Sequence, residues 1–67
     1  MSIWRNASTT HPKRGQNHII FSNNVLVRLD SGVTCIAYYD TLNHEWCDAL
    51  TTRPFLKGEV VEWRDEP

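Results

Sequence analysis

Histidines and cysteines are the residues of this chain whose spacing could bind a metal ion. His44 and Cys47 are separated by two residues, and Cys35, His11 and His18 could supply further ligands. A structural zinc site needs four ligands, which usually come as two closely spaced pairs. The chain offers one such pair, and a free cysteine otherwise packs as a small apolar residue. We therefore expect two small buried thiols and histidines in exposed turns, with no metal site.

The same cysteines could act as nucleophiles. Cys35 or Cys47, together with His44 and either Asp40 or Asp48, contains the residue types that activated nucleophiles use. However, Cys47 falls on a predicted strand, and no segment of the sequence indicates an oxyanion hole. The sequence therefore predicts no covalent catalysis.

Paired carboxylates are the remaining pattern that could perform acid–base chemistry. Glu45 lies close to Asp48, and Glu59 lies close to Glu62. Both pairs are typical of solvated strand and loop positions. We therefore expect no enzymatic activity, no catalytic residue and no cofactor.

The composition describes one small and nearly neutral domain, spanning residues 1–67. The formal net charge is −1, from 7 basic and 8 acidic residues. A dedicated nucleic-acid-binding protein usually has a strongly basic face. The sequence has no apolar leader and no apolar run of the ~20 residues that a membrane span needs. We therefore expect a cytoplasmic protein with reduced thiols, although a Cys35–Cys47 bridge between neighbouring strands is geometrically feasible.

Three tryptophans stand at the start, middle and end of the chain, at Trp4, Trp46 and Trp63. A domain of this size buries only about 60% of its unfolded surface, so its stability is marginal. Each tryptophan buries a large apolar area for a single residue. The three indoles therefore predict a core that joins both termini to a central strand.

Runs of β-branched and aromatic residues predict strands, and no segment has the periodicity of a helix of 10 or more residues. The turn residues Asp30-Ser31-Gly32 connect two of these runs and predict a hairpin over 25–39. The expected strands are 19–29 (interrupted at 22–24), 33–39, 45–50 and 59–63.

These elements predict a mainly-β fold, a twisted antiparallel meander of three to four strands. A sheet must bury one face, so we expect the irregular N-terminal segment, residues 1–18, to cover it, with Trp4 as the anchor. The last strand, with Val60-Val61, is expected at an edge of the sheet, where it could pair with another chain. The expected core is Trp4, Val25, Val27, Leu29, Cys35, Ala37, Tyr39, Trp46 and Trp63.

The segment Arg53-Pro54-Phe55-Leu56 places two large apolar side chains in a predicted loop. Exposed side chains of this kind anchor protein–protein contacts. Arg53, Phe55 and Leu56 are therefore the candidate protein-binding residues. In the alternative interpretation, Phe55 and Leu56 fold back onto the sheet.

Single-stranded nucleic acid is an alternative partner. Lys13, Arg14 and Arg28 could contact phosphates, while Trp4 or Tyr38 could stack on bases. The near-neutral charge argues against this, because phosphate contacts dominate such affinity. A third alternative is a structural domain that associates with itself.

The positions of the tryptophans, turn residues and prolines resemble a small family, the domain of unknown function 551, found mostly in phages and prophages. Members open with Trp and Pro-x-x-Gly, continue through a Val-Leu-Val hairpin and an Ala-x-Tyr strand, and end near Trp and Pro. The matching residues are Trp4, Pro12, Gly15, Val25–Val27, Gly32, Ala37, Tyr39, Trp46, Val60, Trp63 and Pro67. The chain departs from the family at Glu62, at Asp65 and in an apparent insertion over 18–24.

The resemblance implies a phage or mobile-element accessory protein, and it implies no activity. Together with the absence of a catalytic pattern, it predicts a small non-enzymatic protein that acts by binding a protein, either a host protein or a second copy of itself.

Overall fold

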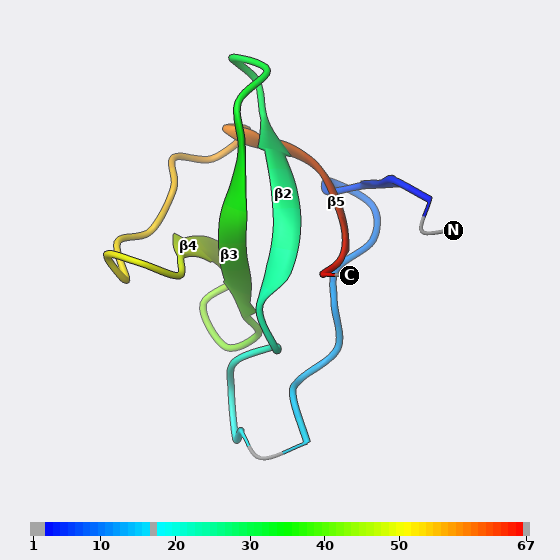
Figure 1. The fold of residues 1–67 in the computed structure, drawn as a ribbon. Coiled ribbons are helices and arrows are strands. Elements are labelled where there is room, and N and C mark those ends of the chain that lie inside the picture. Colours follow the sequence, from blue (N-terminus) through cyan, green and yellow to red (C-terminus); the bar gives the residue numbers. More distant parts are fainter. Residues whose placement is uncertain (1–2, 17, 67) are drawn as a thin grey trace.

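Five antiparallel strands form a single sheet in the computed structural model, which describes residues 3–16 and 18–66 (Figure 1). The strands are β1 (Arg5–Asn6), β2 (Val25–Leu29), β3 (Thr34–Asp40), β4 (Glu45–Asp48) and β5 (Val60–Asp65). The described residues contain no helix, and hence none that is long and apolar enough to cross a membrane. The predicted mainly-β antiparallel architecture is confirmed. Pro67, one of the residues behind the family resemblance, lies outside the described residues.

The strand order is β1-β5-β2-β3-β4. The meander holds for β2, β3 and β4, but β5 pairs with β2 instead of β4. The sheet has five strands where the sequence predicts three or four, because the two residues of β1 are too few to produce a periodic pattern. The expected edge position of Val60-Val61 is wrong, since β5 lies between β1 and β2.

The β2–β3 hairpin follows from its turn residues. Val27 pairs with Cys35 across the two strands. The amide of Leu29 donates to the carbonyl of Val33 at 2.8 Å, and Gly32 has a φ of 91°. A positive φ is accessible to glycine without steric cost, so Gly32 closes the turn. The predicted hairpin is confirmed.

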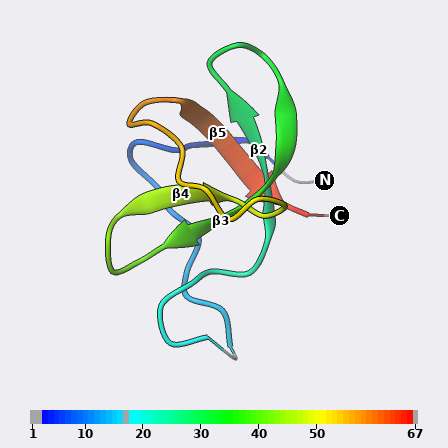
Figure 2. The same ribbon diagram turned by 90° about the vertical axis from the view of Figure 1, so that its left-hand side faces the viewer.

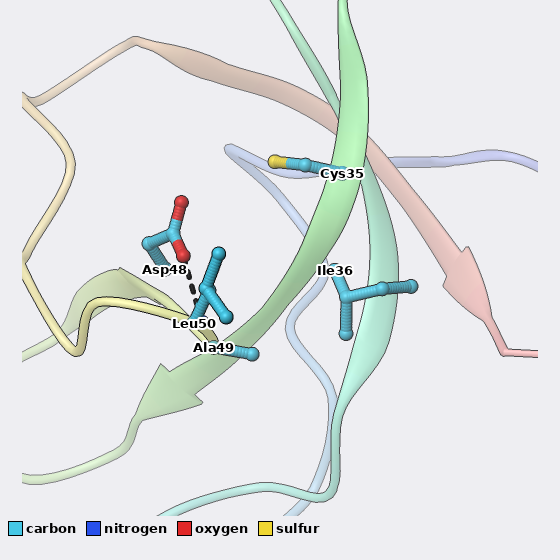
Figure 3. Close-up of a pocket in the computed structure, with 5 residues that line it drawn as sticks. All are labelled: Cys35, Ile36, Asp48, Ala49 and Leu50. Carbon is cyan, nitrogen blue, oxygen red and sulfur yellow. Dashed lines mark hydrogen bonds between the residues drawn. The ribbon is translucent and has the colours of Figure 1, made fainter.

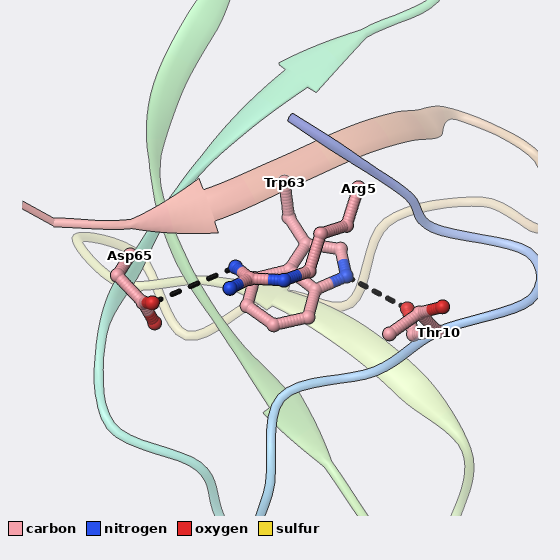
Figure 4. Close-up of polar contacts among 4 residues, drawn as sticks. All are labelled: Arg5, Thr10, Trp63 and Asp65. Carbon is pink, nitrogen blue, oxygen red and sulfur yellow. Dashed lines mark hydrogen bonds and ion pairs between the residues drawn. The ribbon is translucent and has the colours of Figure 1, made fainter. Parts of the chain in front are cut away.

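One face of the sheet, here called the core face, is buried under the N-terminal segment (Figure 2). Ala7 is attached to β5 by a 2.9 Å hydrogen bond from its amide to the carbonyl of Val61. The indole N–H of Trp63 donates to the carbonyl of Thr10 at 2.7 Å (Figure 4). The buried core consists of Ala7, Val25, Val27, Ala37, Val60 and Trp63, with Leu29, Cys35, Trp46 and Phe55 packed against it.

Trp4 is not the anchor of this cover, contrary to the sequence-based expectation. Arg5 pairs with Trp63 and lies over its ring at 4.7 Å, so strand alternation directs Trp4 to the opposite, outer face. There the guanidinium carbons of Arg28 and Arg64 lie 4.3 and 5.1 Å from the Trp4 ring centroid. The half-buried indole therefore packs against cations.

Both edges of the sheet are protected against further strand pairing. At β1, the outward carbonyl of Asn6 accepts the amide of Thr10 at 3.0 Å. At β4, residues 53–55 pair with the outer edge through a bridge between Cys47 and Pro54. Proline has no N–H to offer a further strand. These contacts limit the addition of a further strand at β1 and at β4.

Candidate functional site

A groove of about 670 Å³ opens between three segments that are distant in the sequence. One wall is the N-terminal segment at residues 7–11, another is the start of β4, and the third is the loop 55–58. Its lining includes the aromatic side chains His11, Tyr39, Trp46 and Phe55, and the rim residues Glu45, Leu56 and Lys57.

Three aromatic rings are packed together in this groove. The imidazole of His11 lies parallel to the phenol ring of Tyr39, with centroids 4.3 Å apart and an interplanar angle of 6°. The indole of Trp46 meets the Tyr39 ring edge-on, at 5.0 Å and 65°. Edge-to-face and offset-stacked geometries are the favourable ones for aromatic pairs. The groove therefore has a fixed aromatic lining.

The loop after β4 is positioned by a series of local hydrogen bonds. The Asp48 carboxylate accepts the amides of Leu50 and Thr51 at 2.8 and 3.1 Å. The amide of Phe55 then donates to the carbonyl of Trp46 at 2.7 Å. Because neighbouring side chains alternate on an extended segment, Phe55 is directed toward the core and Leu56 toward solvent.

The candidate protein-binding residues therefore occupy different environments. Leu56 is 80% exposed at the rim of the groove, and Arg53 is also exposed. Phe55 is half-buried against the core, so it both folds back onto the sheet and lines the groove. Sequence reasoning missed His11 as a partner of Tyr39, and no sequence pattern indicates that contact.

The candidate nucleic-acid-binding residues do not gather on one surface. Arg28 forms an ion pair with Glu62 at 2.8 Å as well as covering Trp4. Arg14 pairs with Ser22, before the start of β2, whereas Arg28 lies near the end of that strand. Lys13 and Arg14 are exposed.

A second hollow, of about 400 Å³, lies beside β3 and is lined by Cys35, Ile36, Asp48, Ala49 and Leu50 (Figure 3). Among the described lining residues, the one polar side chain besides the thiol is Asp48, which already accepts the Leu50 amide. Burial, followed by the charges of Asp48 and Glu59, raises the pKa of Cys35. A thiol with a raised pKa stays protonated at neutral pH and is a poor nucleophile.

The thiol of Cys47, like that of Cys35, has a raised pKa. Burial raises the pKa of Cys47, and the two cysteines are both free. Cys35 lies on the core face, whereas Cys47 pairs with Tyr38 on the outer face. Over residues 3–16 and 18–66, no group of three or more His, Cys, Asp or Glu side chains is placed to hold a metal ion.

Asp40, a candidate partner of a cysteine nucleophile in the sequence, stabilises the β3–β4 turn. Its carboxylate accepts the amides of Leu42 and Asn43, both at 3.0 Å, and the side-chain amide of Asn43 at 2.9 Å. The hydrogen bonds from Asn43 and Leu42 and the nearby His44 hold the pKa of Asp40 below its usual value. His44 itself has a φ of 57° in this turn. The Asp40 carboxylate therefore has a structural role, whereas His44 is one of the residues that line the groove.

No family model, no curated protein and no solved structure matches the chain. The resemblance to the domain of unknown function 551 consequently stays a prediction.

Proposed function

We propose that this chain is a non-enzymatic protein-binding domain that uses the aromatic groove as its contact surface. The observation that carries the proposal is the placement of Leu56, which is 80% exposed beside a groove lined by Tyr39, Trp46 and Phe55. Aromatic and aliphatic anchors that surround a pocket are characteristic of interface hot spots. A well-ordered apolar groove is also the default binding-site hypothesis for an uncharacterised fold.

The charge distribution favours a protein partner over a nucleic acid. Arg5 and Arg28 are paired with Asp65 and Glu62 within the fold. Affinity for nucleic acid depends mainly on cations that are free to contact phosphates. The groove rim combines Glu45 with Lys57, a mixture of signs that suits a polypeptide better than a polyanion.

The cellular role that we propose is that of a phage or mobile-element accessory protein acting in the cytoplasm. This part rests on the resemblance of Trp4, Pro12 and Gly15 to the opening motif of the phage family, and on the two free thiols. Free cysteines are usual where the environment is reducing.

A pull-down tests the proposed function. Tagged wild-type protein, a Leu56→Asp variant and a Leu50→Asp variant would be incubated with nuclease-treated bacterial lysate at moderate salt. Leu50 is 91% exposed and lines the other hollow, so its variant is a matched control for added surface charge. We expect a host protein retained by the wild type and by Leu50→Asp, with at least tenfold less on Leu56→Asp.

Two results would contradict the proposal. Retention of material only when nuclease is omitted would point to nucleic acid. Equal retention by all three proteins would place the contact away from the groove.

A further inference from the structure

Two hydrogen-bond donors in the groove have no partner within the described part of the chain. Tyr39 is only 4% exposed, yet no hydrogen bond reaches its hydroxyl from residues 3–16 or 18–66. The Trp63 indole donates to Thr10, but the indole N–H of Trp46 has no acceptor among these described residues. The hydroxyl oxygen of Tyr39 is not completely enclosed by protein atoms, so it keeps contact with solvent. Because Tyr39 lines the groove, a ligand in the groove is placed to reach it.

Both groups can donate a hydrogen bond, and the described groove lining also includes the hydroxyl of Ser8 and the imidazoles of His11 and His44. Burial and the charge of Asp40 raise the pKa of Tyr39, which keeps its hydroxyl protonated. Lys57 adds an ammonium group at the rim, and an indole N–H can only donate. Glu45 is the one carboxylate that lines the groove. A complementary ligand must therefore supply acceptors to the unpaired Tyr39 and Trp46 donors.

The backbone beside the groove is closed to an added strand. β4 pairs on one side with β3 and on the other with residues 53–55, where the Trp46 carbonyl already accepts the Phe55 amide at 2.7 Å. Recognition by strand addition needs a free row of backbone groups. An occupant of this groove is therefore not recognised by strand addition to β4.

We infer that the groove binds a proline-rich segment of a partner protein in the polyproline II conformation. Proline has no backbone N–H, so such a segment presents carbonyl acceptors without donors that the groove would leave unpaired. Its backbone is extended and makes no internal hydrogen bonds, which leaves every carbonyl available to Tyr39 and Trp46. Its flat apolar rings suit an aromatic lining, and its preformed conformation lowers the entropic cost of binding. The inference rests on the proposed function and names the chemistry of its partner.

The test is a titration of isotopically labelled protein with decaproline, followed by two-dimensional NMR of backbone amides and indole N–H groups. A Gly-Ser peptide of equal length is the control ligand. We expect saturable shifts at the Trp46 indole and at residues 55–57 with decaproline, and none with the control. No shift at millimolar decaproline, or equal shifts with both peptides, would overturn the inference.

The Tyr39→Phe variant separates the hydrogen bond from the packing. It keeps the ring that stacks on His11 and removes only a hydroxyl that has no partner among the described residues, so folding is expected to be preserved. We expect the decaproline affinity to fall about fivefold to tenfold, in line with the loss of one hydrogen bond. An unchanged affinity would contradict the assigned donor. Groove binding by proline-free peptides, with none for decaproline, would refute this inference and leave the proposed function standing.

Discussion

The imidazole of His11 stacks on the phenol ring of Tyr39 with a centroid separation of 4.3 Å and nearly parallel planes. This contact joins the N-terminal segment to β3. It also forms part of the groove, so the cover of the core and the candidate site share the same side chains. A substitution that loosens the packing of the N-terminal segment is therefore expected to disturb the groove as well.

The first prediction concerns this stack. His11→Ala should lower the free energy of unfolding by about 1 kcal/mol, the usual contribution of an aromatic pair beyond its buried area. Urea unfolding followed by tryptophan fluorescence measures the change. His18→Ala, at an exposed position, is the matched control and should be nearly neutral. Equal effects of the two variants would contradict the role given to His11.

The second prediction separates the tryptophans. Trp63 is buried and hydrogen-bonded to Thr10, so Trp63→Ala should cost roughly 3–5 kcal/mol and unfold much of the population at 25 °C. Trp4 is half-buried against Arg28 and Arg64, so Trp4→Ala should cost only about 1 kcal/mol. Circular dichroism during thermal unfolding would report both. A larger loss from Trp4→Ala would reverse the assignment of the two faces.

The third prediction is a pH dependence from Asp40. Its pKa is lowered in the folded protein, so the ionised form contributes stability that is fully present above about pH 4 and is lost as the pH falls through the folded pKa. Asp40→Asn should therefore be less stable than the wild type at pH 7, and the difference should shrink between pH 4 and pH 2. Urea unfolding across this range measures it. A constant difference would show that the charge of Asp40 contributes nothing.

The fourth prediction concerns Gly58, which has a φ of 85° in the loop that carries Leu56. A Cβ there would meet no atom within 4 Å, so the cost of Gly58→Ala is conformational, about 1 kcal/mol. Lys57→Ala, the exposed neighbour, should leave stability unchanged. Chemical denaturation of both variants checks the difference, and a neutral Gly58→Ala would mean that the loop readily adopts another conformation.

The β2–β3 hairpin, the mainly-β fold class and much of the core follow from local sequence patterns. Gly32 marks the turn, and the alternation of Val25 and Val27 marks the buried face. The place of β5 could not be predicted, because its partner β2 is more than 30 residues away and strand order is set by tertiary packing. Trp4 was misplaced for a related reason, since the two-residue strand that determines its face has no sequence pattern.

The site was predictable only in part. Arg53-Pro54-Phe55-Leu56 stands out as an apolar loop, and the structure places its Leu56 at the rim of the groove. The wall formed by residues 7–11 depends on the position of His11, which follows from the hydrogen bonds of Ala7 and Thr10 to β5. Those bonds involve backbone atoms, so residue types do not reveal them.

The three indole N–H groups provide the most direct test of the central claim, that the groove is the contact surface. Trp46 reports on the groove, Trp4 on the outer face and Trp63 on the core. Labelled protein would be titrated with a peptide selected against it from a random-sequence display library, with the indole signals assigned by Trp→Phe variants. The account predicts that the Trp46 signal shifts most while the Trp4 signal stays in place. A shift of Trp4 with Trp46 unmoved would contradict it and place the contact on the outer face.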